Sequence, residues 1–97
     1  MQKKVQIYDF TKDAAISIRD GKIVFDEIEK LLRKQKDVLL DFENVDIVLM
    51  QFLNAAIGEL FKNHSYDYLS EKLSVVNIKY PEKWNVAIRN GRRKYKR

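Results

Sequence analysis

The chain has 97 residues, of which 45% are hydrophobic and 34% are charged. This is enough for one domain with a modest core, and too apolar a composition for a disordered chain. The absence of cysteine excludes disulfides, thiolate catalysis and cysteine-ligated zinc. No segment has the apolar length of a signal peptide or a membrane helix, so we expect a cytoplasmic protein that does not contact a membrane.

The net charge of +5 is concentrated at the C-terminal end. Six of the 19 basic residues and none of the 14 acidic residues lie in residues 89–97, so residues 1–88 carry a net charge of −1. The body of the domain is therefore not expected to be a nucleic-acid-binding surface.

Alternating apolar and polar residues predict a first strand near residues 3–10. Residues 14–18 can extend that strand or follow it. The turn signal Asp20-Gly21 comes next, and the carboxylate of Asp20 can cap a helix over about residues 21–35. This helix has an apolar stripe, with acidic residues early and basic residues late, as the helix dipole favours.

The centre of the chain predicts a strand that leads directly into an amphipathic helix. Residues 38–41 form a continuous apolar run that ends in an aspartate, which is typical of a strand covered on both faces. A turn at residues 43–46 follows, and a helix then runs from about residue 50 to Asn63, which can adopt the left-handed conformation after a helix end. Such a pair is the start of a βαβ unit.

The last third predicts a helical turn within residues 65–70, a strand over residues 72–78 and a final helix that Pro81 begins. The order β–α–β–α–β–α predicts an α/β domain with a mostly parallel or mixed sheet packed with helices. We expect one domain over residues 1–91 and a fraying basic tail over residues 92–97. The pattern leaves open whether helices cover one or both faces of the sheet.

Four places in the chain resemble a known family. They are Arg19 with Gly21, the stretch L-D-F-E-N-V at residues 40–45, the stretch F-L-N-A-A-I-G at residues 52–58, and Val76-Asn77 near the end of the last strand. There the chain is similar to the STAS-like domains of unknown function, which are related to the STAS domain of anti-sigma factor antagonists. The likeness covers roughly residues 16–80. It implies a STAS-like fold and a regulatory module without enzymatic activity, whose protein partner is often a kinase-like ATPase.

The resemblance also implies a difference in regulation. Antagonists that use phosphorylation carry a serine at the start of the second helix, whereas the matching positions here are Met50 and Gln51. Neither side chain can be phosphorylated, so the resemblance implies that this chain lacks the phosphoacceptor and interacts constitutively. What is left of that mechanism is a protein-binding surface around the start of the helix.

The start and outer face of the second helix are the candidate partner-binding surface. Apolar side chains there would contact the partner and polar ones would form hydrogen bonds, while the small residues Ala55 and Gly58 would admit a partner backbone. A glycine inside a helix costs about 1 kcal/mol relative to alanine, and the other interpretation is that Gly58 makes room for an element of the same chain. The candidate partner-binding residues are Met50, Gln51, Phe52, Asn54, Ala55 and Gly58.

The sequence contains no catalytic motif, and we expect no cofactor or metal. Asp41 can accept hydrogen bonds from the next turn or line a small polar site, and its neighbours Glu43 and Asp46 are more often solvated than metal-bound. His64 is the only histidine and has no motif beside it, and the three glycines are isolated, so they form no phosphate-binding loop.

The alternative function is that of a nucleic-acid-binding accessory protein that uses the basic C-terminal tail. Its positive charges can contact phosphates, and Tyr95 can stack on a base. The competing interpretation is a solvated, frayed terminus. The candidate nucleic-acid-binding residues are Arg89, Arg92, Arg93, Lys94, Lys96 and Arg97.

Overall fold

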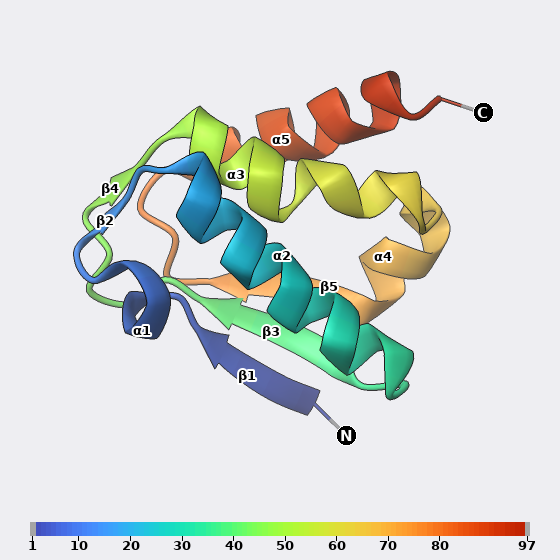
Figure 1. The fold of residues 1–97 in the computed structure, drawn as a ribbon, viewed down its shortest axis with the longest axis horizontal. Coiled ribbons are helices and arrows are strands. Elements are labelled where there is room, and N and C mark those ends of the chain that lie inside the picture. The colour runs from blue at the N-terminus through green and yellow to red at the C-terminus, as the bar shows by residue number, and fades with distance from the viewer. Residues whose placement is uncertain (1, 97) are drawn as a thin grey trace.

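A three-stranded parallel sheet forms the base of the fold in the computed structural model, which describes residues 2–96 (Figure 1). Its strands are β1 (Gln2–Gln6), β3 (Asp37–Asp41) and β5 (Leu73–Val76), in the order β1-β3-β5. Both pairings are parallel, so the predicted α/β architecture with a parallel sheet is confirmed.

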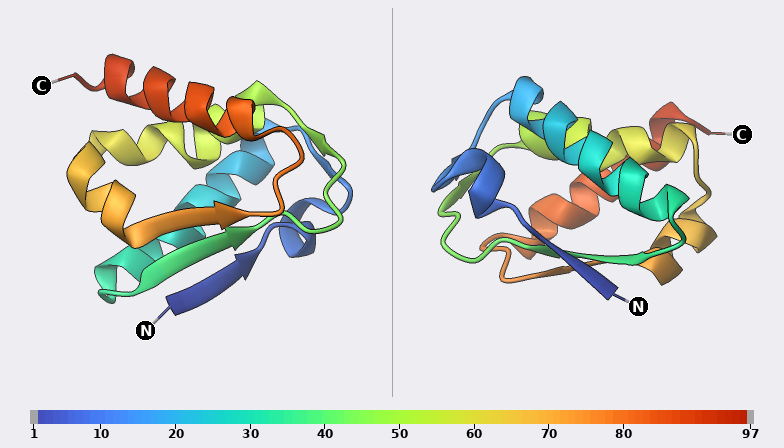
Figure 2. Two further views of the ribbon diagram at one scale, coloured as in Figure 1. Left: turned by 180° about the vertical axis from the view of Figure 1, so that it is seen from behind. Right: turned by 60° about the horizontal axis from the view of Figure 1, so that its bottom comes forward.

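The helices cover only one face of this sheet, as the right-hand view of Figure 2 shows. Val5, Val38 and Leu40 point toward the helices and are buried. On the opposite face Lys4 is exposed and Leu39 is only half-buried. The expectation that the central strand is covered on both faces was therefore wrong, because its apolar run includes one residue that the open face leaves partly in solvent.

A second, two-stranded parallel sheet lies at the end of the main sheet where β1 and β3 finish (Figure 1). It pairs β2 (Ala14–Ala15) with β4 (Ile47–Val48). The first strand is shorter than predicted, because the chain turns after β1 into the four-residue helix α1 (Tyr8–Thr11). The carbonyl of Ile7 accepts hydrogen bonds from two amides of this turn, so residues 7–10 do not continue the strand.

Helix α2 (Ile18–Arg33) begins three residues before the predicted start. Its N-cap is Ser17, whose hydroxyl oxygen accepts a hydrogen bond of 3.0 Å from the backbone N–H of Asp20. The Asp20-Gly21 pair is therefore inside the first turns of the helix and forms no turn before it. The buried side of α2 consists of Gly21, Val24, Ile28 and Leu32.

The predicted second helix consists of two segments, α3 (Met50–Ala56) and the 3₁₀ helix η1 (Gly58–Lys62). Asn63 follows with φ of −111°, so it does not adopt the left-handed conformation that the sequence suggested. Between the sheet and the helices lies the hydrophobic core. Its largest fully buried side chains include Ile7, Phe42, Phe52, Leu53, Ile57 and Leu60.

The chain then forms α4 (Tyr66–Lys72), which Ser65 caps and which is longer than the single turn expected. The last helix, α5 (Pro81–Lys94), has its proline in the first turn as predicted. It continues through Lys94 instead of fraying from residue 92. Within residues 2–96 no helix combines the length and the apolar character that crossing a membrane requires.

Candidate functional site

Helix α5 covers part of the face of α3 and η1 that the sequence left for a partner. A Cβ atom placed on Gly58 would lie 3.6 Å from the carbonyl oxygen of Ala87 and 3.8 Å from the Cα of Gly91, both in α5. Gly58 is buried in this contact. The prediction that Gly58 contacts a partner was thus wrong. The other interpretation, that Gly58 makes room for an element of the same chain, is correct.

Ala55 lies on the other flank of α3, where α2 crosses it. A Cβ atom placed on Gly21 would lie 2.8 Å from the Cβ of Ala55 and 2.6 Å from the carbonyl oxygen of Phe52. Gly21, one of the residues that carry the family resemblance, is thus required for the close approach of α2 to α3. Ala55 itself stays half-buried between the helices.

Phe52 is fully buried in the core, so it does not provide the surface contact that was expected of it. The sequence analysis placed Phe52 among the outward-facing residues of the second helix. Helices α2 and α5 both pack against α3, so together they enclose a wider arc of this helix than one neighbour would, and Phe52 falls inside that arc. A substitution at Phe52 would therefore test the stability of the core and not partner binding.

The start of α3 is exposed, and apolar side chains surround it. The amide N–H of Leu49 donates to the carbonyl of Ala15 over 2.9 Å, which extends the pairing of β2 with β4 by one step. Because side chains alternate along a strand, Ile16, Ile47 and Leu49 all point outward from this ribbon. Together with the first residues of α2 and α3, they form a surface that we name the entry patch. Its members are Ile16, Ile18, Ile47, Leu49, Met50 and Gln51.

Gln51, the polar member of the entry patch, ties the start of α3 to the segment after β2. The side-chain amide Nε2 of Gln51 donates a hydrogen bond of 2.8 Å to the carbonyl oxygen of Ile16. Met50 is half-buried beside it. The sequence identified Met50 and Gln51 but missed the other members, because the pairing of β2 with β4 joins segments more than 30 residues apart without any local signal.

A groove continues from the entry patch between α2 and α5, with α3 and η1 as its floor. It has a volume of about 550 Å³. Asn54 lies in the floor and accepts a side-chain hydrogen bond of 3.3 Å from Asn90 of α5. Ile18 and Gln51 belong both to the groove and to the entry patch. The remaining residues that shape its walls include Lys22, Phe25 and Lys94.

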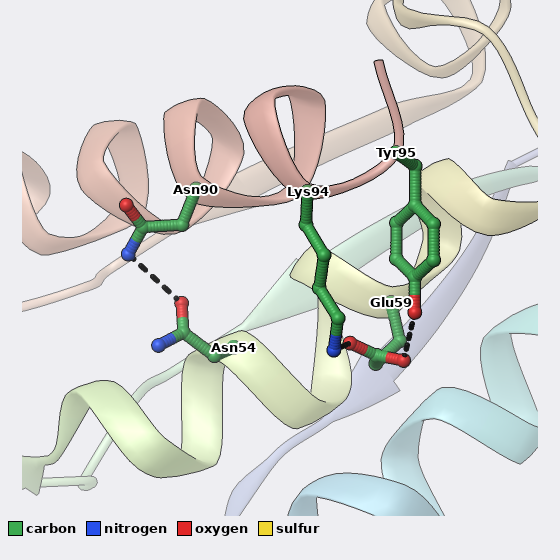
Figure 3. A network of polar contacts seen from close by, with 5 residues as sticks. All are labelled: Asn54, Glu59, Asn90, Lys94 and Tyr95. Atoms are coloured by element: carbon green, nitrogen blue, oxygen red, sulfur yellow. Dashed lines mark hydrogen bonds and ion pairs between the residues drawn. The ribbon is translucent and has the colours of Figure 1, made fainter. Parts of the chain in front are cut away.

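Glu59 holds the C-terminal end of α5 against η1 (Figure 3). One carboxylate oxygen accepts from Nζ of Lys94 at 2.8 Å, and the other accepts from the hydroxyl of Tyr95 at 2.5 Å. Burial acts to raise the pKa of Glu59, but these hydrogen bonds outweigh it and lower that pKa. The hydrogen bond to Glu59 also raises the pKa of Tyr95. Tyr95 therefore braces the domain through its hydroxyl, and the stacking of its ring on a base stays a prediction.

Asp41 closes the carboxyl end of the central strand and is 3% exposed. Its Oδ1 accepts hydrogen bonds of 2.9 Å from the backbone N–H of Glu43 and from Nδ2 of Asn77, and its Oδ2 lies 3.4 Å from Nζ of Lys4. The hydrogen bond from Asn77 is the largest influence on the pKa of Asp41, which is lowered despite burial. Two residues of the family resemblance thus bind each other.

Two further titratable candidates, Asp46 and His64, also have partners in the fold. Asp46 pairs with Lys79 at 3.2 Å. His64 contacts Glu29 of α2 at 2.5 Å through Nε2 and stacks on the ring of Tyr68. Among the residues that the structure describes, no three His, Cys, Asp or Glu side chains gather in a way that could hold a metal ion.

The basic residues of the C-terminal end do not form one surface. Lys94 faces Glu59 and the groove between α2 and α5, whereas Arg89, Arg92, Arg93 and Lys96 line a separate groove of about 510 Å³. Arg97 lies outside the described residues.

A family model matches the part of the chain that contains the residues on which the fold depends. Neither the curated proteins nor the solved structures contain a match to this chain. A family model described as a STAS-like domain of unknown function (DUF4325) matches residues 20–83. That range spans α2 to the start of α5 and includes Gly21, Asp41 and Asn77, whose contacts are described above. Because the match covers more than half of its length, the chain belongs to the family of STAS-like domains of unknown function.

Proposed function

We propose that this protein is a non-enzymatic regulatory module of the cytoplasm that binds a protein partner through the entry patch. The observation that carries the proposal is the exposure of several large aliphatic side chains around the start of α3. Ile16 is 42% exposed, Ile47 is 49% exposed and Leu49 is 37% exposed, and the pairing of β2 with β4 brings their segments together. Contiguous apolar surface of this kind is typical of interaction sites.

The shape of the surface supports an interaction with an apolar segment of a partner. The aliphatic side chains of the entry patch lead into the groove above Asn54 and Ala55, so a segment that packs on the patch can extend along α3. Lys22 on the wall of the groove is exposed and would complement an acidic residue at the edge of such a segment. The family resemblance favours a kinase-like ATPase as the partner.

The same surface supports constitutive binding. Met50 and Gln51 occupy the positions at which related antagonists carry a phosphorylated serine, and neither can accept a phosphate. Gln51 instead ties α3 to the segment after β2 through its bond to the carbonyl of Ile16. The partner-binding conformation of the patch thus needs no covalent modification in this proposal.

A photo-crosslinking amino acid at Leu49 tests the proposal in cells of the source organism. Val76 is the matched control position, because it is exposed to nearly the same extent, 39% against 37%, but lies on the open face of the sheet. We expect a crosslinked protein partner from Leu49 and none from Val76. Equal crosslinking from both positions, or none from Leu49, would refute the proposal.

Two charge substitutions provide a quantitative version of the test with the purified partner. Leu49→Lys places an ammonium group in the apolar patch and is expected to weaken partner binding at least tenfold, because a buried unpaired charge in an interface is costly. Val76→Lys makes the same kind of change on the open face and should leave the affinity within about twofold. Circular dichroism of both variants establishes that they fold.

A further inference from the structure

Beyond the entry patch, the outer side of α5 presents a cationic stripe. Asn85, Arg89, Arg92 and Lys96 recur at spacings of three or four residues and therefore lie along one side of the helix and its extension. With Arg93 and Ile88 they line the groove of about 510 Å³ that runs beside α4. We name this surface the α5 groove.

The cations of the α5 groove are not neutralised by the domain itself. None of the described residues that line the groove is acidic. No ion pair to a described carboxylate is formed by Arg89, Arg93 or Lys96, whereas Lys94, in the same turn of the chain, is paired with Glu59. The structure thus separates one internally paired cation from a group of unpaired ones that face solvent.

An aromatic ring stands at the edge of these cations. Tyr66, at the start of α4, is 42% exposed, and the guanidinium carbon of Arg92 lies 4.0 Å from the centre of its ring. A tyrosine ring and a guanidinium plane both serve as platforms for stacked bases in single-stranded nucleic acids. An acidic peptide would use the cations but would have no use for this platform.

We propose that the α5 groove binds single-stranded nucleic acid, with phosphates on Arg89, Arg92, Arg93 and Lys96 and a base stacked on Tyr66. The four cations, from Arg89 to Lys96, extend over about 10 Å along the axis of the helix and its extension. Phosphates of a stacked strand repeat about every 3.4 Å, so this length accommodates about four of them. The number of phosphates matches the four cationic side chains of the groove.

The residues that this proposal assigns to binding differ from those of a fraying basic tail. It includes Tyr66, which belongs to another helix, and it excludes Lys94 and Tyr95, which are held by Glu59. This division gives an unusually close control, because Lys94 and Lys96 are two residues apart and carry the same charge but only Lys96 lines the α5 groove.

The test measures binding of a fluorescent single-stranded oligonucleotide of about 12 nucleotides to the full chain by anisotropy over a range of salt concentrations. Four phosphate contacts predict a slope of about −2.8 in a plot of log affinity against log salt, which is a loss of about 50-fold between about 50 and 200 mM salt. Lys96→Gln should reduce the slope by about 0.7, and Lys94→Gln should leave it unchanged.

Tyr66→Ala separates stacking from charge. We expect it to weaken the oligonucleotide affinity about tenfold without changing the salt slope, because a stacking contact releases no counterion. A duplex of the same sequence should bind more weakly, since its bases are not available to Tyr66. Circular dichroism of each variant confirms folding.

Three results would overturn the proposal. They are the absence of oligonucleotide binding at low salt, equal effects of Lys94→Gln and Lys96→Gln on the slope, and an affinity that Tyr66→Ala does not change. Displacement of the oligonucleotide by polyglutamate at equal charge concentration, together with the third result, would assign the α5 groove to an acidic protein instead.

Discussion

The two glycines at the contact between α5 and η1 face each other, yet the structure predicts opposite responses to the same substitution. A Cβ atom on Gly91 would lie 2.5 Å from the carbonyl oxygen of Gly58, 2.6 Å from Cδ2 of Phe61 and 2.8 Å from the Cα of Gly58. A Cβ atom on Gly58 would meet nothing closer than 3.6 Å. Neither glycine has a positive φ, so steric contact is the deciding factor.

The magnitudes follow from these distances. Alanine in place of glycine stabilises a helical position by about 0.5–1 kcal/mol, because it restricts the unfolded chain. In Gly91→Ala the new methyl group meets backbone atoms that can move only if α5 shifts away from η1, and overpacking of this kind costs about 1–3 kcal/mol. We expect Gly91→Ala to lose about 1–2 kcal/mol of stability and Gly58→Ala to lose none or to gain about 0.5 kcal/mol.

Urea unfolding followed by circular dichroism measures both effects. With a denaturant dependence of about 1.5 kcal/mol per molar urea for a small domain, Gly91→Ala should lower the unfolding midpoint by about 1 M. Gly58→Ala should keep the midpoint or raise it slightly. If Gly58→Ala is as destabilising as Gly91→Ala, or if Gly91→Ala is not destabilising at all, the packing of α5 on η1 described above is incorrect.

Three further predictions concern the polar contacts. The folded-state pKa of Asp41 is lowered. The stability that its carboxylate contributes is therefore present above its unfolded pKa of about 3.9 and is lost as the pH falls through the folded value. When unfolding is measured as a function of pH, Asp41→Asn should lose less stability below about pH 4 than the wild type does. Asn77 has φ of 60° and donates to Asp41, so Asn77→Ala should lose about 1 kcal/mol more stability than Asn77→Gly in urea unfolding, since glycine adopts this φ without the steric cost that alanine incurs. Tyr95→Phe removes one hydrogen bond from Glu59 and should raise the pKa of Glu59 in NMR titration and speed amide exchange in the last turn of α5.

Residues with a strong local pattern could be located from the sequence. The central strand, the helix after it and the proline at the start of α5 lie where periodicity and turn chemistry placed them. Asp41 was expected to accept a hydrogen bond from the following turn, and the amide of Glu43 donates that bond. Each of these features depends on residues within a few positions of one another.

Features that depend on distant parts of the chain could not be located in this way. The two-residue strands β2 and β4 are too short to have a period, and they form only because residues 14–15 and 47–48 are brought together. The burial of Phe52 and Gly58 depends on α2 and α5, which approach α3 from opposite flanks. The candidate partner surface therefore lost Phe52 and Gly58 and gained four residues that lie outside α3, namely Ile16, Ile18, Ile47 and Leu49.

The positions of the two proposed surfaces follow from one feature, the docking of α5 on η1 through Gly58. Because α5 occupies that flank, the exposed part of α3 is its start, next to β2 and β4 (Figure 1). The same docking turns the opposite side of α5 toward α4, where Arg92 meets Tyr66. The entry patch and the α5 groove share no residue, because the first surrounds the start of α3 and the second lies between α5 and α4. A partner protein and a nucleic acid strand could thus be bound at the same time, and a substitution such as Leu49→Lys disturbs one surface while leaving the other intact.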